Sequence, residues 1–190
     1  SSCYGRCAMA AQVAMTPLLR PAQASDLGPL AILARETYSA AFGHTFEVAA
    51  DLASHLETHL SEAAVALWLA EDRVTVAELD GRLVGFAHFG PTLKGSYGGF
   101  PHEGDPALHR LYVARDLLNA GVGGTLLRAA LANMEAMGRD IYLDVWEENH
   151  GAQRLYARHG FAPLGRVKLE TASGADAGFD FVMVRRRVAG

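Results

Sequence analysis

The chain has 190 residues, half of them hydrophobic and a fifth charged, which suits one globular α/β domain and excludes an intrinsically disordered protein. Its 17 basic and 21 acidic residues give a net charge of −4, without the basic excess that a nucleic-acid-binding surface needs. No apolar run approaches the ~20 residues of a membrane-spanning helix, so we expect neither nucleic acid nor membrane as a partner.

Both cysteines, Cys3 and Cys7, lie in the opening segment 1–15, which lacks the charged start and apolar stretch of a signal peptide. We interpret this segment as an N-terminal extension or an added segment, with Met15 as the natural start, and residues 16–190 as one domain. A domain without cysteine has no disulfide framework, which is typical of a cytoplasmic protein. Two thiols are too few for a structural zinc site, so no metal is predicted.

The first half of the chain predicts one strand, three helices and a β-hairpin. Ser25-Asp26 offers an N-cap for the first helix. Asp80-Gly81 lies between two strand-like runs and predicts a hairpin turn in which both residues have positive φ. The expected strands cover 17–21, 74–79 and 82–89, and the expected helices cover 25–41, 47–60 and 61–69.

The second half of the chain predicts two strand–helix units and a final pair of strands. A Gly-rich loop, 90–106, precedes them, and Gly160 ends the last helix. Because hairpins and crossovers are mixed, we predict one mixed sheet covered by helices. The expected strands cover 108–113, 141–146, 164–171 and 179–187, and the expected helices cover 122–137 and 149–159.

The stretch 109–127 combines a strand, a glycine-rich turn and an amphipathic helix. Such a turn directs free backbone N–H groups and the positive end of the helix dipole at one point, where a diphosphate can bind. Tightening of the turn alone would also explain the glycines. A P-loop would need a lysine directly before Thr125. A Rossmann fingerprint would need another glycine spacing, although Asp140 and Asp144 lie at about the distance of its ribose acid.

The next segment joins a strand to a helix through Asn149, with Tyr156 and then a Gly-Phe pair further along the helix. Together with the preceding strand, turn and helix, it resembles the GNAT superfamily of N-acetyltransferases, and the likeness covers 17–187. The resemblance implies a GNAT fold of the α/β class, with one mixed, mostly antiparallel sheet of about six to seven strands flanked by about four helices. It also implies acetyl-CoA as cosubstrate. Segments 20–22 and 41–44 are loosely similar to polyamine and small-amine acetyltransferases.

The resemblance also implies the cofactor contacts. Backbone groups of three strand residues would bond the pantetheine arm, N–H groups of the turn would hold the pyrophosphate, and Asn149 would contact the cofactor where the strands separate. Leu118 stands where the family usually has Gln or Arg, a departure that leaves the backbone contacts unaffected. The strand residues are Leu111, Tyr112 and Val113, and the turn residues are Asn119, Ala120, Gly121, Val122, Gly123 and Gly124.

Transfer of an acetyl group from a thioester to an amine needs a proton donor for the departing thiolate and a proton acceptor for the amine. By the resemblance, Tyr156 is the donor, and a phenol can serve because Tyr and Cys have reference pKa values of ~10 and ~8.5. Many relatives carry an acid at the position of Ala107. His109 is therefore the expected acceptor here, with His88 as the nearest strand-borne alternative and Glu147 or Glu148 as alternatives from the other side.

The acceptor substrate is expected to be a small-molecule amine or a protein amine, in contact with His44, Glu147 and Glu148. The two glutamates would favour a cationic amine. We expect direct transfer without a covalent enzyme intermediate, because no thiol nucleophile lies in the domain. A non-catalytic acyl-CoA sensor with the same fold is the alternative, which the departures at Ala107 and Leu118 keep open. Homodimers are common among relatives, so self-association is a further expectation.

Overall fold

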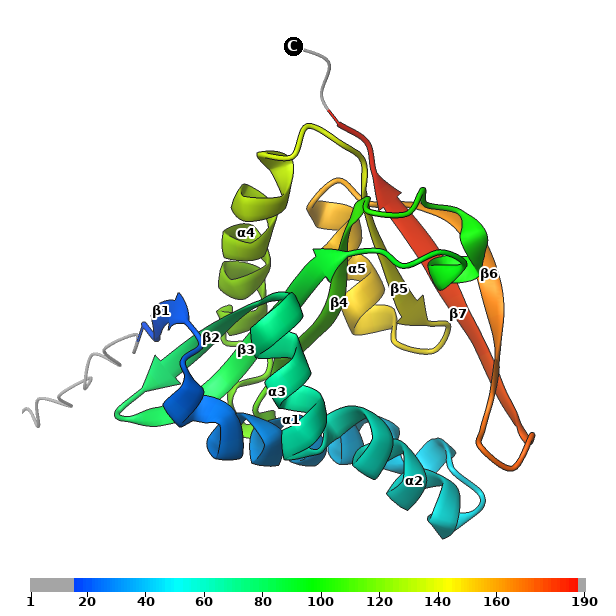
Figure 1. Cartoon of the computed structure of the whole chain (residues 1–190), viewed down its shortest axis with the longest axis horizontal. Coiled ribbons are helices and arrows are strands. Elements are labelled where there is room, and N and C mark those ends of the chain that lie inside the picture. Colours follow the sequence, from blue (N-terminus) through cyan, green and yellow to red (C-terminus); the bar gives the residue numbers. More distant parts are fainter. Residues whose placement is uncertain (1–15, 188–190) are drawn as a thin grey trace, which may run out of the picture.

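The computed structural model describes residues 16–187, which form a seven-stranded sheet with helices on both faces (Figure 1). The strands lie in the order β1-β2-β3-β4-β5-β7-β6, and β4–β5 is the one parallel pair among these neighbours. The strands are β1 (Leu18–Pro21), β2 (Arg73–Leu79), β3 (Arg82–Pro91), β4 (Pro106–Val113), β5 (Ile141–Trp146), β6 (Ala162–Glu170) and β7 (Asp176–Arg185). The α-helices are α1 (Leu27–Phe42), α2 (Ala49–Leu60), α3 (Glu62–Glu71), α4 (Val122–Glu135) and α5 (His150–Arg158).

The segment 1–15, with Cys3 and Cys7, lies outside the described residues, as does 188–190. Within residues 16–187, no helix has both the length and the apolar character needed to cross a bilayer.

Every strand and helix predicted from the sequence is present, with ends displaced by at most three residues. Residues 16–187 contain five α-helices, as predicted in chain order, and α2 is separated from α3 at Ser61. Its hydroxyl accepts a hydrogen bond from the Ala64 N–H at 3.3 Å and so caps α3. The hairpin turn is confirmed, since Asp80 and Gly81 have φ angles of 50° and 76°.

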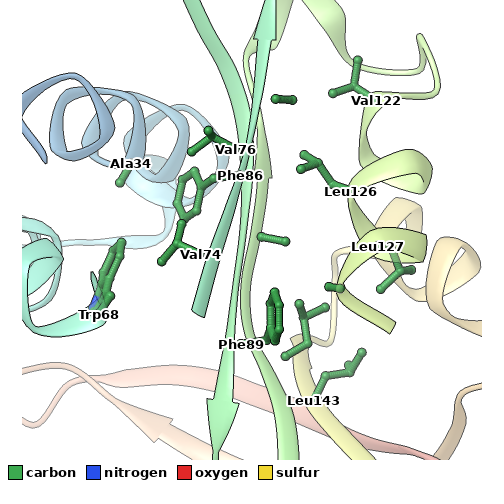
Figure 2. Close-up of a cluster of buried hydrophobic side chains, with 14 of the residues drawn as sticks. Ala34, Trp68, Val74, Val76, Phe86, Phe89, Val122, Leu126, Leu127 and Leu143 are labelled. Atoms are coloured by element: carbon green, nitrogen blue, oxygen red, sulfur yellow. The ribbon is translucent and has the colours of Figure 1, made fainter. Parts of the chain in front are cut away.

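A layer of buried apolar side chains covers each face of the sheet (Figure 2). On the face covered by α1 and α3, Trp68 and Phe86 stack with ring centroids 6.1 Å apart. The opposite face is covered by α4 and α5. We call these the α1 face and the α4 face. Figure 2 shows Ala34, Trp68, Val74, Val76 and Phe86 on the first, and Phe89, Val122, Leu126, Leu127 and Leu143 on the second.

Strands β4 and β5 are paired only near their starts, and Leu108–Leu143 is the last pair. The register of β4 against β3 shifts directly after Leu108, so His109 is an extra residue in a β-bulge. Beyond the bulge β4 stays with β3, whereas β5 continues beside β7, and the two strands separate. The side of β4 that faces β5 therefore lacks a strand partner from 109 to 113. We call this region, 109–113 with 144–146, the splay.

Candidate active site

The predicted phosphate-binding turn lies between β4 and α4. Asn119 and Gly121 have φ angles of 65° and 86°, and this left-handed backbone turns the chain sharply before the helix. The Thr125 N–H donates to the Gly121 carbonyl at 3.1 Å, which is the first bond of the helical series. The N–H groups of 122–124 precede it and lie without helical partners at the positive end of the helix dipole. This arrangement suits a phosphate group.

Packing does not require glycine at positions 123 and 124. A Cβ on Gly123 would lie 3.6 Å from Val113 Cγ2 and 3.7 Å from Leu155 Cδ2, which is ordinary van der Waals contact. A Cβ on Gly124 would meet nothing closer than 3.5 Å. Because the protein itself leaves room there, a ligand that approaches the main chain is the better explanation of these glycines. The turn therefore fits the pyrophosphate of a coenzyme A molecule.

Ala120 is the least suitable member of the predicted phosphate-binding set. Its N–H donates to the Leu117 carbonyl at 3.2 Å, within the turn that follows β4, and is already used. Leu118 has a side chain that is 56% exposed. It carries no polar group toward a phosphate, so the backbone of the remaining turn residues has to supply the contacts.

Leu111, Tyr112 and Val113 form the part of β4 that borders the splay. Their backbone groups have no strand partner on that side, so an extended ligand chain can pair with them as an added strand would. The Tyr112 side chain lies on the α1 face against Phe86, with ring centroids 5.6 Å apart. The predicted pantetheine contacts therefore have free backbone groups available.

Asn149 is the N-cap of α5. Its Oδ1 accepts a hydrogen bond from the Ala152 N–H at 3.2 Å, and its own N–H donates to the Trp146 carbonyl at 2.9 Å. Capping explains the residue without any ligand. Its side-chain nitrogen has no hydrogen-bond partner among residues 16–187, so the predicted cofactor contact stays available to it.

Tyr156 is 7% exposed, and its ring packs edge-on to Phe161 with centroids 6.0 Å apart. Its hydroxyl makes no hydrogen bond within residues 16–187. No side-chain oxygen there is both unbonded and fully buried, so this hydroxyl reaches accessible space. Burial raises the pKa of Tyr156 above its ordinary value, and Asp144 adds to the effect. The phenol is therefore protonated at neutral pH, as a proton donor must be.

Three side chains form a hydrogen-bonded chain on the α1 face beside the splay. Arg110 Nη1 lies 3.0 Å from His88 Nδ1, and His88 Nε2 lies 2.7 Å from Asp72 Oδ2. Arginine can only donate, so His88 Nδ1 accepts, and the ring proton lies on Nε2 and is donated to Asp72. Burial lowers the pKa of His88, in agreement with a neutral ring.

His109, the predicted proton acceptor, lies at the bulge next to this chain. Its Nδ1 is 2.7 Å from the Tyr97 hydroxyl, and Tyr97 itself has a strained φ of 52°. Burial, followed by the effect of His88, lowers the pKa of His109 to about 4. At neutral pH the ring is unprotonated but binds a proton weakly. It is thus a weaker acceptor than the ordinary pKa of histidine suggests.

Asp72, His88 and His109 carry possible ligand atoms that all lie within 4.8 Å of one another. Two histidines and a carboxylate can bind a metal ion. Here, however, Arg110 and Asp72 use both ring nitrogens of His88, so no lone pair of that ring is free for a metal. Asp72 and His88 thus belong to the hydrogen-bonded chain that holds Arg110, whereas His109 is bonded to Tyr97.

Two aspartates that the sequence analysis did not place in the site lie across the splay. Leu143 points to the α4 face, so the next residue, Asp144, points to the α1 face, and Asp180 lies on the same face because it pairs with Trp146. Burial raises the pKa of Asp180 to about 7, and Asp144 and Glu147 add to this. The pKa of Asp144 is also raised, although its side chain is open to solvent. Neither carboxylate has a side-chain partner among residues 16–187.

The predicted acceptor contacts lie near the end of β5. The His44 ring is 5.9 Å from the Trp146 ring system. Glu147 Oε1 accepts a hydrogen bond from the Phe179 N–H at 3.0 Å, which ties this carboxylate to β7. Glu148 is exposed. The structure thus brings His44 and Glu147 beside the splay, whereas Glu148 stays at the surface.

A cavity of about 1040 Å³ lies elsewhere, between α1 and the β1–β3 end of the sheet. Two of its three arginines, Arg20 and Arg82, form ion pairs with Asp26, Glu78 and Asp116, so these charges satisfy one another. None of the site residues predicted from the sequence lines it. We therefore place the candidate active site at the splay.

Comparison with known proteins gives a consistent result. A model described as the Acetyltransferase (GNAT) family matches residues 35–161. The uncharacterised N-acetyltransferases Rv2669 of Mycobacterium tuberculosis and Mb2688 of Mycobacterium bovis are each 31% identical over 140 residues, which cover 72% of this chain and 83% of theirs.

Solved structures show the same fold. The PaiA N-acetyltransferase of Thermoplasma acidophilum, in complex with coenzyme A, aligns with a TM-score of 0.70 at 20% identity, over 90% of this chain and 99% of that one. The ribosomal-protein-S18-alanine N-acetyltransferase of Escherichia coli aligns with a TM-score of 0.64 at 18% identity, over 91% and 96% of the two chains. With the family match and the relatives above, the chain belongs to the GNAT family of acetyltransferases and is an acyltransferase.

Proposed function

We propose that this enzyme transfers the acetyl group of acetyl-CoA to a primary amine by direct attack at the splay. The proposal rests on two side chains without hydrogen-bond partners in residues 16–187, one on each face of the sheet beside the splay. Tyr156, from α5 on the α4 face, has a free hydroxyl, and Asp180, on the α1 face, is a carboxylate with a pKa of about 7. Acetyl-CoA would be held by the turn 119–124 and the free edge of β4, and the amine would enter from the α1 face.

The protons balance as follows in this proposal. An ammonium substrate gives one proton to Asp180, which passes it to solvent. The neutral amine then attacks the thioester carbonyl carbon, the C–N bond forms, and the C–S bond breaks. Tyr156 gives its proton to the departing thiolate, and the second amine proton replaces it through water. A free N–H of β4 can stabilise the negative charge that develops on the carbonyl oxygen.

The acidic pair also supports a cationic substrate. Burial raises the pKa of both Asp144 and Asp180, and the nearby acids Asp144 and Glu147 raise that of Asp180 further. A bound ammonium group would favour the ionised form of both carboxylates. Glu147 was expected to attract the amine, but it already accepts a backbone hydrogen bond. We therefore propose Asp144 and Asp180 as the principal acids of the acceptor site.

The proton acceptor can be identified from the pH dependence of kcat/KM. If Asp180 accepts the proton, activity is present above pH 7 and is lost as the pH falls through about 7, because the carboxylate becomes protonated. Asp180→Asn should lower kcat/KM by about 100-fold and remove this limb of the profile. His109→Gln is the competing variant. If it removes the limb near pH 7 while Asp180→Asn keeps it, the acceptor is His109 and not Asp180.

The activity itself is tested by release of free thiol from acetyl-CoA over a panel of primary amines, with secondary amines and alcohols as controls. We expect release with primary amines and a product that is larger by one acetyl group in mass spectrometry. Calorimetric binding of acetyl-CoA without thiol release from any amine would favour the non-catalytic sensor and contradict the proposal.

A further inference from the structure

Arg110 is a cation in an unusual position. It lies in β4 directly after the bulge, and its side chain is only partly exposed. No carboxylate in residues 16–187 forms an ion pair with it. Every other arginine of that part of the chain without such a partner is exposed. A charge removed from water without a direct counter-ion destabilises a protein, so its presence calls for an explanation.

Two neutral neighbours hold the guanidinium in place. His88 accepts a hydrogen bond from Nη1 at 3.0 Å, and the Trp68 ring lies under the group at 4.4 Å from its centroid. Asp72 is one imidazole further away, on the other side of His88. The other two guanidinium nitrogens have no hydrogen-bond partner in residues 16–187, and neither is fully buried. Arg110 is therefore fixed in orientation, while the N–H donors on its other two guanidinium nitrogens stay free.

Two neutral histidines of α2 lie close enough to Arg110 for its charge to affect their pKa values. His55 and His59 of α2 both have lowered pKa values, chiefly through burial, and Arg110 contributes to both shifts. The acidic pair lies in the same region, and Asp144 is close enough to Arg110 to affect its pKa, although the two form no ion pair. One cation and two carboxylates without side-chain partners in residues 16–187 are thus present together. A ligand with one charge only would leave either the cation or the acids unsatisfied.

We propose that Arg110 binds an acidic group on the acceptor, so that the substrate is a small amino acid-like molecule with both an amine and a carboxylate or similar oxyanion. The guanidinium fork matches the two oxygens of such a group. Asp144 and Asp180 bind the ammonium end and bring it to the thioester. This inference rests on the proposed amine acetylation, and it makes Arg110 the residue that selects the substrate.

Matched substrate pairs test it: free amino acids of different chain lengths, each compared with its own carboxamide. The wild-type enzyme should prefer at least one acid over its amide. Arg110→Met should raise KM for that acid by about 10- to 100-fold, which corresponds to the loss of a charge-assisted hydrogen bond, and leave the amide within about threefold. The effect should fall on KM, because Arg110 contacts a group that does not react. Arg110→Lys should restore part of the preference, and Arg73→Met, at an exposed arginine without an ion pair, should change nothing.

Binding is measured separately by calorimetry, with the coenzyme A-saturated protein titrated with the acid and with the amide. This readout does not need turnover, so it distinguishes the two proposals. Tighter binding of the acid, lost in Arg110→Met, supports the acidic subsite even if no acetyl transfer is found. If the wild-type protein shows the same KM and the same binding affinity for the acid and its amide, the inference is overturned. This holds even if amines are acetylated. If Arg110→Met does not fold, the wild-type comparison and Arg110→Lys decide the matter.

Discussion

Replacing Gly123 with aspartate is expected to weaken acetyl-CoA binding by about 100-fold or more. The Gly123 N–H is one of the free donors at the start of α4. A carboxylate at this position would occupy the space that a phosphate needs and would place a negative charge against it. The helix dipole favours the new carboxylate for the same reason that it favours the phosphate, so the side chain competes for the site. Isothermal titration with acetyl-CoA measures the loss.

Gly123→Ala is the matched control for bulk without charge. The added Cβ would lie 3.6 Å from Val113 and 3.7 Å from Leu155, so the folded protein can accommodate it. We expect a smaller loss of affinity for this variant than for the aspartate, with little change in melting temperature. Unchanged affinity in a folded Gly123→Asp protein would show that the pyrophosphate does not bind at this turn.

Tyr156→Phe is expected to lower kcat by about 100-fold while acetyl-CoA affinity stays nearly constant. The hydroxyl makes no hydrogen bond in the described part of the chain, so its removal leaves no orphaned partner, and the ring contact with Phe161 remains. A stability defect therefore cannot account for the loss. The raised pKa of Tyr156 would not prevent the transfer, because a thiol that leaves into the same buried surroundings would also have a raised pKa.

Tyr142→Phe provides the control for this second experiment. Tyr142 is also a buried tyrosine with a raised pKa, but it packs with Ala107 and Val184, where β4 and β5 are still paired. Its replacement should leave kcat unchanged. Single-turnover measurements are needed to show that chemistry limits the rate. Wild-type rates for Tyr156→Phe under those conditions would make Tyr156 a packing residue only.

Local signals account for what the sequence predicted correctly. The turn at Asp80-Gly81 depends on the two residues that form it. The end of the last helix likewise depends on Gly160, which has a φ of 85°. The glycine-rich turn before α4 combines neighbouring glycines with the helix that follows them. None of these requires knowledge of a distant part of the chain.

The charged residues Arg110 and Asp180 could not be placed in the site from such local signals. Simple alternation along β4 would place Arg110 on the face opposite to His109. The bulge breaks that alternation and brings the arginine to the α1 face beside His88. Asp180 belongs to the site only because β7, and not β6, lies next to β5. This strand order depends on contacts between residues that are far apart in the sequence. From the sequence we expect an ordinary histidine pKa for His109, because sequence patterns do not reveal the burial that lowers it.

The position of β7 between β5 and β6 also separates the two halves of the site in folding and in stability. The phosphate-binding turn and the edge of β4 come from one short, continuous stretch, 109–124. Asp180 is positioned by a late hairpin that must reach back to β5 across the whole of α5 and β6. Contacts between residues so far apart in the sequence form more slowly than local ones. Partial opening of the β6–β7 hairpin would thus remove acceptor recognition first and leave a protein that still binds its acetyl donor.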